Sequence, residues 1–474
     1  MPRSLSRRDL LAGAAAGLGV AATAACSRKP KKLEDLPPPN IIVLVTDDQR
    51  WNALGCAGNG IIQTPALDSL AEQGTRFPNA FVTTSICVSS RASLLTGLYT
   101  RRHGIIDFSQ QLSRPQVARS YPAILRASGY WTGFVGKHGL GGADALEPEF
   151  DFWRGFDGQG NYFEPGTGRY SHLTARLGDQ CREFVDTVPR NTPFCLSVSF
   201  KAAHAVDEDP DPYQHDRRFN EYYAGRQIPW PPTATDADHF ALPPFVRDGE
   251  GRRRFLQRFS DPDRAQENLR NYYRLITGVD DAVGRLLAEL ERTGHLRNSI
   301  VLFTSDNGYA LGDRGLTDKW HPYEESIRVP MIVTDFRPLA HARRGQVQRS
   351  MALNIDVAPT VLDYARAKGP RCDGLSLMPL VAGERLDSAD RTPWRNNFFY
   401  EHLFQHPGIP KSEAVRSESW KYIRWVEHDV EQLFDLRADP NEREDLVNSR
   451  RAAPYLAEMR SQWRTYRETL GDPA

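Results

Sequence analysis

The feature that most constrains the fold is a set of continuous apolar runs, each followed by polar or charged residues. Residues 40–46 form a largely β-branched run without the polar alternation of a half-exposed strand. Comparable runs occupy residues 194–200 and 300–304. Strands that are apolar throughout are typical of parallel sheets covered by helices on both faces. The sequence therefore predicts an α/β fold with a buried sheet.

Carboxylate and amide side chains follow two of these runs. Asp47 and Asp48 come after the first run, and Asp306 and Asn307 follow residues 300–304. Ligand-binding groups in open α/β sheets gather at the carboxyl ends of strands. Adjacent carboxylates repel one another unless a cation lies between them, and oxygen ligands suit Ca²⁺ or Mg²⁺ rather than zinc. The alternative for either pair alone is a solvated acidic turn.

A cysteine opens the stretch of residues 87–97 (Cys-Val-Ser-Ser-Arg-Ala-Ser-Leu-Leu-Thr-Gly), in which a small-residue turn leads into a helix-like run from Ala92 to Leu98. We expect the helix to start near Ser89 or Ser90, whose hydroxyls are suitable N-caps. Cys87 would then precede the positive end of a helix dipole, with Arg91 one turn in. A nucleophile, a cation and a helix N-terminus at one point suit an oxyanion such as sulfate or phosphate. The alternative is a buried structural cysteine.

Basic side chains follow two further strand-like runs. Residues 131–136 lead into Lys137 and His138, and residues 194–200 lead towards His204. Lys137 is suited to hold an anion as a point charge, and His138 to carry a proton. His204 is a candidate acid or ligand. The alternatives are a solvated surface pair and a structural histidine.

Several helices and shorter strands are expected around these runs. The helix at residues 64–74 has Thr64 at the N-cap and Pro65 in its first turn. Apolar residues at three- and four-residue spacing from Leu269 to Leu290 predict a long amphipathic helix closed by Gly294. The other expected helices lie at residues 121–128, from residue 354, and at about 454–469. The other expected strands lie at residues 77–83, 331–333, 420–425 and 432–436.

Two segments have no regular periodicity. Residues 149–165 are rich in aromatic side chains and glycine, and we expect an ordered aromatic loop near the site rather than a core element. Residues 204–263 are rich in Pro, Asp and Arg. A connection of that length is expected to be a functional insertion over the cleft.

The N-terminus has the pattern of a bacterial export signal, expected over residues 1–26. Arg7 and Arg8 form a twin-arginine motif, and an Ala/Gly-rich run follows that is shorter than the ~20 residues of a membrane-spanning helix. The small residues before Cys26 resemble a lipoprotein cleavage site, which would attach the protein to a membrane through a lipid on Cys26. The alternative is ordinary signal-peptidase cleavage and a periplasmic protein. Residues 27–39 are expected to be an exposed linker.

The composition bounds the domain count and the class of partner. A chain of 474 residues with 60 basic and 60 acidic side chains has a net charge of zero, which gives no reason to expect nucleic acid as a partner. The length favours one large α/β domain, expected at residues 40–385, and a small C-terminal subdomain at residues 386–474. Cys56, Cys181, Cys195 and Cys372 lack metal-ligand spacing, and we expect buried thiols, although export would permit disulfides.

The order of these motifs resembles the type I sulfatases of the alkaline-phosphatase-like superfamily. The resemblance rests on Cys-x-Ser-x-Arg with Ala-Ser-Leu-Leu-Thr-Gly, on Gly136-Lys137, on Asp-Asn-Gly at residues 306–308, on Lys319 before Tyr-Glu-Glu-Ser, and on residues 433–440. It spans Asn40 to the C-terminus. It implies a sulfuric ester hydrolase with a three-layer αβα fold, a large mostly parallel mixed sheet, and a small C-terminal α+β subdomain with an antiparallel sheet.

Carried over residue by residue, the resemblance implies a calcium-dependent site. In this family the cysteine, here Cys87, is oxidised by a formylglycine-generating enzyme to an aldehyde whose gem-diol attacks sulfur. Arg91 and Lys137 would stabilise this nucleophile, and His204 and Lys319 would hold the sulfate, with His204 protonating the leaving alcohol. The implied ligands of the single calcium ion are Asp47, Asp48, Asp306, Asn307 and modified Cys87.

The chain departs from the family pattern at two positions. The family usually reads Gly-Lys-x-His, which would place a histidine where this chain has Gly139, so His138 is the candidate replacement. Ser89 stands where the family more often has Pro or Ala.

Substrate and function classes remain to be distinguished. The long insertion, the aromatic segment and the Tyr-Glu-Glu-Ser motif are similar to those of carbohydrate sulfatases, which favours a sulfated glycan over an aryl or choline ester. One alternative is a phosphonate monoester or phosphodiester hydrolase of the same superfamily, although Asn307 favours calcium over zinc. Another is an unmatured, non-catalytic protein that binds sulfated glycan.

Overall fold

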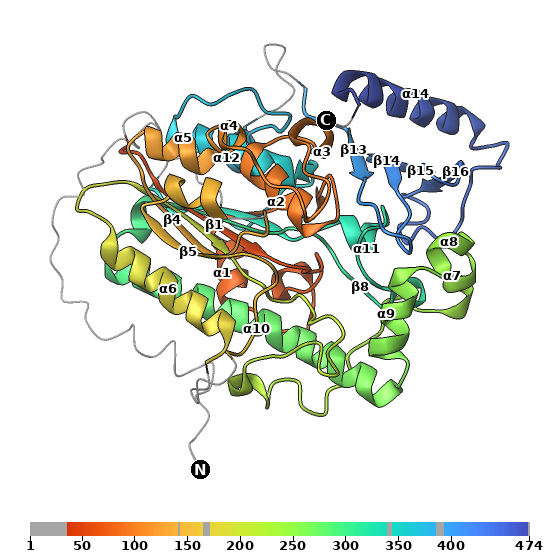
Figure 1. Cartoon of the computed structure of the whole chain (residues 1–474), viewed down its shortest axis with the longest axis horizontal. Coiled ribbons are helices and arrows are strands. Elements are labelled where there is room, and N and C mark those ends of the chain that lie inside the picture. The colour runs from red at the N-terminus through yellow and green to blue at the C-terminus, as the bar shows by residue number, and fades with distance from the viewer. Residues whose placement is uncertain (1–35, 141–142, 165–170, 339–343, 385–392, 473–474) are drawn as a thin grey trace, which may run out of the picture.

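A large mixed sheet forms the centre of the molecule (Figure 1). The computed structural model describes residues 36–140, 143–164, 171–338, 344–384 and 393–472. The eight strands lie in the order β11-β2-β10-β7-β1-β6-β4-β5. Their bounds are β1 Asn40–Thr46, β2 Thr75–Arg76, β4 Trp131–Lys137, β5 Phe152–Phe156, β6 Phe194–Ser199, β7 Ser299–Ser305, β10 Met331–Asp335 and β11 Gln346–Val347.

The sheet is parallel through its middle and mixed at one side. Strands β7, β1, β6, β4 and β5 pair parallel to one another, whereas β10 pairs antiparallel with both β7 and β2. The expected mostly parallel mixed sheet is thus confirmed, and each long strand matches an apolar run of the sequence.

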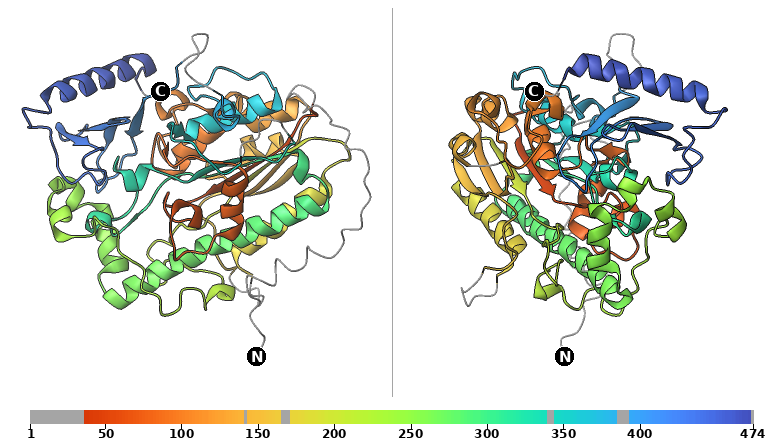
Figure 2. Two further views of the ribbon diagram at one scale, coloured as in Figure 1. Left: turned by 180° about the vertical axis from the view of Figure 1, so that it is seen from behind. Right: turned by 45° about the vertical axis from the view of Figure 1, so that its right-hand side comes forward.

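Helices cover both faces of the sheet (Figures 1 and 2). One layer contains α1 Pro65–Gln73, α6 Leu173–Thr187 and α10 Pro262–Arg292, and the other contains α2 Cys87–Thr96, α5 Tyr121–Ala127 and α12 Val357–Ala365. Alternate residues of β1 enter different cores. Val43 packs in the core that includes α2 and α12, and Leu44 packs in the core that includes α6 and α10. This explains why the strand is apolar on both sides.

Shorter elements complete the main domain. Two-stranded pairs are formed by β3 Ala80–Phe81 with β12 Ala352–Leu353, and by β8 Ala310–Leu311 with β9 Thr317–Asp318. The short helices are α3 Thr100–His103, α4 Arg114–Val117, α11 Glu324–Ile327 and α13 Met378–Val381. Within residues 77–83, where a longer strand was expected, the strand is only β3.

The aromatic segment contributes to the core, which corrects the expectation of a loop. Its middle forms β5, the edge strand that pairs with β4. The ring of Trp153 stacks on Phe134 with 5.1 Å between centroids, and Phe150 packs against both rings. The aromatic side chains therefore bury the edge of the sheet.

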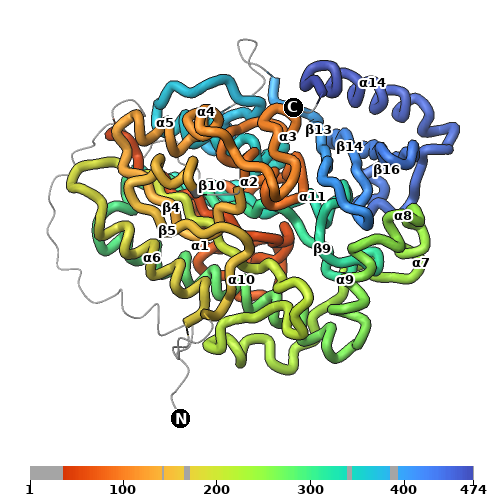
Figure 3. Tube along the Cα trace, in the orientation of Figure 1, coloured from red at the N-terminus to blue at the C-terminus, as the bar shows by residue number. Residues whose placement is uncertain are grey.

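The insertion is more regular than its composition indicates. It contains α7 Asp236–Phe240, α8 Pro244–Arg247 and α9 Glu250–Phe259, and α10 begins at Pro262. Figure 3 shows α7 and α8 beside the C-terminal sheet. The Phe245 ring stacks on His428 with 3.7 Å between centroids, so part of the insertion packs on the C-terminal sheet.

The C-terminal region is a separate antiparallel sheet with one helix. Strands β13 Asn397–His402, β14 Ser412–Ser417, β15 Trp420–Trp425 and β16 Val430–Asp435 pair in sequence order, and α14 Ala453–Leu470 packs on β14 and β15. The expected α+β subdomain is therefore present. Its expected boundary after residue 385 falls within residues 385–392, outside the described residues.

A buried arginine connects this sheet to the main domain. Arg101 of α3 pairs with Glu401 of β13 at 2.7 Å and with Glu413 of β14 at 2.8 Å. Its side chain also donates to the carbonyl of Gly471, after α14.

The N-terminal predictions lie mostly outside the described residues. Arg7, Arg8 and Cys26 belong to residues 1–35. Of the last residues of the expected linker, Pro37 and Pro38 are exposed, whereas Leu36 is buried and its carbonyl accepts a hydrogen bond from Arg366. In the described ranges, no helix is both long and apolar enough to cross a membrane. Cys56, Cys181, Cys195 and Cys372 are free thiols, two of them buried and two half-buried.

Candidate active site

Most of the candidate residues come from the carboxyl ends of four adjacent strands. Asp47 and Asp48 follow β1, and Asp306 and Asn307 follow β7, whose Ser305 is the register partner of Thr46. Lys137 ends β4, and His204 lies five residues after the end of β6. Parallel pairing brings these ends to one edge, as predicted.

The carboxylates form a buried cluster. Oxygen atoms of Asp47, Asp48 and Asp306 lie within 4.8 Å of one another, and none of the three residues is more than 1% exposed. Burial raises the pKa of Asp48 well above its usual value against the attraction of Lys319, and burial together with the charge of Asp47 raises the pKa of Asp306. Burial opposes ionisation of Asp47 too, but Lys137 and the other nearby cations hold its pKa well below the usual range.

Asn307 completes this cluster with an unpartnered oxygen. Its amide Nδ2 donates to Asp48 at 2.7 Å and to Asp306 at 2.9 Å. Its buried Oδ1 has no hydrogen-bond partner in the described part of the chain. An amide turned by half a rotation would present this oxygen to the carboxylates, which only a cation between them would favour. The donor set therefore fits a hard divalent cation.

Cys87 is the first residue of α2, which corrects the expected helix start. The N-cap is Ile86, and neither serine hydroxyl caps the helix. Ser90 instead donates to the carbonyl of Asp306 at 2.5 Å, because its side chain faces the strand ends. Cys87 therefore occupies the first turn, where backbone N–H groups lack helical partners.

The thiol of Cys87 lies between a carboxylate and an ammonium group. Its Sγ is 3.4 Å from Asp47 Oδ1 and 3.3 Å from Lys319 Nζ. Burial and the negative charge of Asp47 raise the pKa of the thiol to about 12, despite the nearby lysines. The thiolate is therefore scarce at neutral pH, and an unmodified cysteine is a poor nucleophile here.

Arg91 holds several of these groups in place. Its Nε donates to Asp306 at 2.8 Å, and its Nη2 lies 3.2 Å from Asp47. The remaining nitrogen, Nη1, donates to the carbonyl of Lys137 at 2.5 Å and to the hydroxyl of Ser199. The guanidinium thus connects β1, β4, β6 and β7.

Two lysines contact different carboxylates of the cluster. Lys137 Nζ lies 2.5 Å from Asp47 Oδ2, and Lys319 Nζ lies 2.6 Å and 2.8 Å from the two oxygens of Asp48. Burial disfavours the Lys319 ammonium, but Asp48 and the other nearby negative groups raise its pKa well above the usual value. Both lysines are therefore held against carboxylates.

His204 faces the same cluster. Its Nε2 is 3.7 Å from Asp48 Oδ2, and it lies within the 4.8 Å grouping that includes Asp47 and Cys87. Its Nδ1 is 2.5 Å from the carbonyl of Ala205, so Nδ1 carries the proton in the neutral ring. Burial and the positive charge of Lys319 lower its pKa well below the usual value.

His138 lies beside the cluster rather than in it. Its ring packs against Trp153, its Nδ1 accepts from the backbone of Leu140, and its buried Nε2 has no partner among the described residues. A Cβ on Gly139 would instead lie 3.3 Å from Arg91 Cδ and 3.5 Å from Lys137 Cε. Position 139 therefore faces the site residues, and no described contact joins His138 to Cys87 or to the carboxylates.

Three residues near the candidate site are absent from the predicted site. Gln159 accepts from Lys137 Nζ at 2.7 Å, and Asp318 forms buried ion pairs with Arg254 and Arg258 beside Lys319. Lys201 donates to the carbonyl of Gly160, and burial and the charge of Lys137 lower its pKa to about 8. Lys201 directly follows a buried strand run, which is a signal that the sequence did contain. Gln159 lies in an irregular segment and Asp318 in the two-residue strand β9, and neither has such a signal.

Two models of known families match residues 39–469 between them. The model described as "Sulfatase" matches residues 39–367, and the model described as "N-sulphoglucosamine sulphohydrolase, C-terminal" matches residues 312–469. The chain therefore belongs to the sulfatase family, and it is a sulfuric ester hydrolase. Membership implies a formylglycine and a metal site, for which the cluster of Asp47, Asp48 and Asp306 is the candidate.

Individual relatives give the same class. The chain is 28% identical to an N-acetylglucosamine-6-O-sulfatase of Bacteroides thetaiotaomicron over 93% of this chain and 88% of that protein. It is 29% identical to a choline-sulfatase of Rhizobium meliloti over 87% and 83% of the two chains. A structure solved with its substrate D-glucosamine-2-N,6-O-disulfate superposes with a TM-score of 0.80 at 25% identity, covering 92% of this chain and 99% of that one.

Proposed function

We propose that this sulfatase removes sulfate from a sulfated carbohydrate, using Cys87 matured to formylglycine beside one calcium ion. The observation that carries the proposal is the position of the Cys87 side chain. It lies at the start of α2, between Asp47 and Lys319 and beside the acidic cluster.

The raised pKa of Cys87 supports the maturation. A thiol with a pKa of about 12 supplies little thiolate at neutral pH. Formylglycine, when formed and hydrated, would supply one hydroxyl oxygen to attack sulfur. Deprotonation of its second hydroxyl would then break the C–O bond to the bound sulfate and restore the aldehyde. The proposal therefore includes a formylglycine-generating enzyme as a partner.

The acidic cluster and the unpartnered Asn307 oxygen support the metal. Asp47, Asp48, Asp306 and Asn307 would hold the ion through oxygen atoms, as calcium prefers. A bound calcium ion supplies a fixed positive charge that neutralises the cluster and polarises the sulfate oxygens.

The basic residues would stabilise the charge of the reacting ester. The ammonium group of Lys319 lies beside the Cys87 side chain, and that of Lys137 lies beside Asp47. Fixed cations favour a transition state with negative charge on the sulfate oxygens, because they need no reorganisation. Arg91 orients Asp47 and Asp306.

His204 is the proposed proton donor to the leaving alcohol. In the neutral ring Nε2 carries no proton, since Nδ1 donates to Ala205. Binding of an anionic ester beside Nε2 would oppose the repulsion from Lys319 and favour protonation. His204 would then take up a proton with the substrate and release it to the alcohol oxygen.

Mass analysis of the peptide containing residue 87 tests the nucleophile. We expect formylglycine at this position in protein made with a maturation enzyme, and loss of sulfate release in Cys87→Ala. Cys56→Ala, a half-buried thiol elsewhere, is the control and should keep its activity. Turnover by Cys87→Ala like that of the parent would contradict the proposal. An unmodified Cys87 in inactive protein that still binds sulfated glycan would support the non-catalytic alternative.

Chelation tests the metal. Removal of divalent ions should abolish sulfate release, and Ca²⁺ should restore it better than Zn²⁺. Restoration by zinc alone, together with hydrolysis of phosphonate monoesters, would favour the phosphonate hydrolase alternative.

A panel of substrates tests the carbohydrate. We expect kcat/KM for a defined sulfated monosaccharide to exceed that for choline sulfate and for an aryl sulfate. The relatives provide the support, since one is an N-acetylglucosamine-6-O-sulfatase, but another is a choline-sulfatase. Preference for choline sulfate would overturn the carbohydrate assignment and leave the sulfatase activity intact.

We also propose export by the twin-arginine route, with the mature protein periplasmic or anchored through Cys26. The support is the sequence of residues 1–26, which lie outside the described structure. Replacing Arg7 and Arg8 with Lys should retain the protein in the cytoplasm. Cell fractionation measures this, and unimpaired export of the double variant would contradict it.

A further inference from the structure

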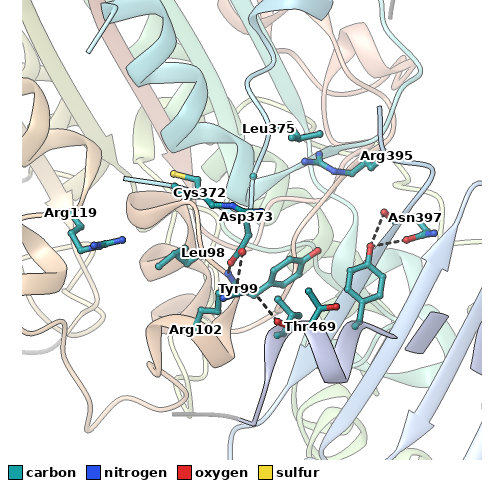
Figure 4. Close-up of a pocket in the computed structure, with 14 residues that line it drawn as sticks. Leu98, Tyr99, Arg102, Arg119, Cys372, Asp373, Leu375, Arg395, Asn397 and Thr469 are labelled. Carbon is teal, nitrogen blue, oxygen red and sulfur yellow. Dashed lines mark hydrogen bonds and ion pairs between the residues drawn. The ribbon is translucent and has the colours of Figure 1, made fainter. Parts of the chain in front are cut away.

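A basic groove lies where the C-terminal helix α14 meets the loop that follows α2 (Figure 4). It has a volume of about 1000 Å³, at the upper end of the range for small-molecule sites, about 300–1,000 Å³. Residues 98–102, residues 371–375 and the C-terminal region contribute its walls. Figure 4 shows Arg119 on one side, Arg395 and Asn397 on the other, and Tyr99 and Asp373 between them.

The groove is separate from the candidate active site. Cys87 begins α2, and Leu98 and Tyr99 follow its other end. A helix of 10 residues is about 15 Å long at 1.5 Å per residue. No residue that lines the groove belongs to the candidate metal or catalytic residues.

The lining is more positive than the chain as a whole. It contains Arg102, Arg119, Arg371 and Arg395 but one carboxylate, Asp373, whereas the complete chain has 60 basic and 60 acidic residues. Arg102 pairs with Asp373 at 3.0 Å, and Arg395 pairs with the buried Asp356. Arg119 and Arg371 form neither an ion pair nor a side-chain hydrogen bond with any residue in the described ranges. Among the described residues, the groove therefore carries two positive charges without an ion-pair or hydrogen-bond partner.

The floor of the groove is held by backbone hydrogen bonds. The amides of Asp373 and Gly374 donate to the carbonyl of Gly97 at 2.9 Å and 3.2 Å. The amide of Tyr99 donates to Asp373 Oδ2 at 3.1 Å. These bonds fix residues 372–374 against the end of α2, so the arginines surround a pre-formed surface.

Neutral polar and aromatic groups line the same groove. The hydroxyl of Tyr466 donates to Asn397 Oδ1 at 2.7 Å, and the Tyr466 ring is half-buried. Thr469, an exposed residue, also lines the groove. Hydroxyl, amide and ring faces are the groups that bind sugar rings, and guanidinium groups bind oxyanions through paired N–H donors.

We propose that this groove binds a sulfated segment of a carbohydrate chain while another part of the chain is at the active site. The inference rests on the proposed function, because it names the polymeric form of the same substrate. Arg119 and Arg371 would bind sulfate groups, and the groove would raise the affinity for polymers without affecting small esters.

Binding of fluorescein-labelled dextran sulfate, measured by anisotropy on the full-length protein, tests the groove. The double variant Arg119→Ser/Arg371→Ser should bind about tenfold more weakly, because two exposed charge contacts are lost. Its kcat/KM for an aryl sulfate and its Tm should equal those of the parent. The matched control is Arg190→Ser/Arg297→Ser, which removes two other exposed arginines that form no ion pair with described residues and precede β6 and β7.

The outcomes distinguish the groove from general charge attraction. Weaker binding in the first double variant alone supports the proposal. Equal weakening in both double variants, no change in either, or equal competition by single-stranded DNA of the same charge would overturn it. The binding assay requires no turnover. If the protein hydrolysed no sulfate ester, the proposed function would be contradicted, but the assay would still show whether the groove binds sulfated carbohydrate.

Discussion

At the scale of single residues, Arg91 is the group on which the site depends most. It is 4% exposed and contacts two carboxylates, a backbone carbonyl and a hydroxyl from four strands. A lysine can supply the charge at this position but not the planar set of donors.

We expect Arg91→Lys to lower kcat/KM by at least ~100-fold with a small loss of stability, since the positioning of Asp47 and Asp306 would be lost. Arg91→Ala should cost about 3–5 kcal/mol in the free energy of unfolding, because two buried carboxylates lose a partner. Turnover and urea unfolding measure these effects. Arg126→Lys, at an exposed pair with Asp151, is the control and should change neither. Full activity in Arg91→Lys would show that charge alone suffices.

Gly139 permits a second test at this scale. It has φ +64°, and an added Cβ would lie 3.3 Å from Arg91 Cδ. Gly139→Ala should cost about 1–2 kcal/mol in stability for its left-handed conformation and should also lower kcat/KM by displacing Arg91. Gly158→Ala is the matched control, because Gly158 has the same φ and open space around it. Equal activity of the two variants would contradict a role for the contact with Arg91.

Much of the candidate site could be predicted because parallel strands present their end residues at one edge. Asp47, Asp306 and Lys137 each end a buried run, so their proximity follows from the topology. Gln159 could not be predicted, because it reaches Lys137 from an irregular segment after β5. The prediction of a serine N-cap was wrong, because such preferences consider only the local sequence. The Ser90 hydroxyl donates instead to the carbonyl of Asp306, which is distant in the chain.

At the scale of elements, α10 holds α1 in place through a buried carboxylate. Asp280 accepts from the backbone amides of Leu67 at 2.8 Å and Ala66 at 3.2 Å, in the first turn of α1. Burial raises its pKa to about 7, although the two amides oppose the shift. The long helix thus anchors the start of a short one.

This pKa predicts a pH-dependent effect of Asp280→Asn. The folded protein holds a proton that the unfolded chain releases near pH 3.8, so the stability contributed by Asp280 falls as the pH rises from about 4 to about 7. The variant should therefore gain about 2–4 kcal/mol relative to the parent between pH 4 and pH 8. Urea unfolding across this range measures it. Asp263→Asn, an exposed position in the first turn of α10, is the control. A difference that does not vary with pH would contradict the prediction.

Elements were predicted best where one physical pattern extends over many residues. The continuous apolar runs predicted β1, β6 and β7, because a strand buried on both faces is apolar along its length. The three- and four-residue spacing predicted α10, because a helix buried on one face repeats its apolar residues over many turns. Strand β5 was missed, because its aromatic side chains and Gly155 lack the pattern of a buried strand. The short helices α7, α8 and α9 depend on packing against distant parts of the chain, which no local pattern records.

At the scale of the whole molecule, Arg101 joins the main domain to the C-terminal sheet. The side chain is completely buried, and its two acidic partners belong to different strands of that sheet. Buried ion pairs therefore join the main domain to the C-terminal sheet, and their stability depends on both carboxylates having a positively charged partner.

Arg101→Leu should destabilise the protein by about 3–5 kcal/mol, because Glu401 and Glu413 would remain buried with fewer partners. Thermal unfolding measures the loss, and limited proteolysis should cut the variant first between the main domain and β13. Arg102→Leu is the matched control, since the neighbouring side chain is 39% exposed and its ion pair should contribute less than ~1 kcal/mol. A similar loss in both variants would show that Arg101 acts only through the helix α3.

The burial of Cys87 has a consequence for timing. The residue is 1% exposed, so under the proposed maturation we expect the enzyme to modify it before the chain folds. Maturation would then compete with folding, and each folded molecule would stay either active or inert. The specific activity of a preparation would report the ratio of two rates, and a variant that folds more slowly could be the more active one when the maturation enzyme is scarce.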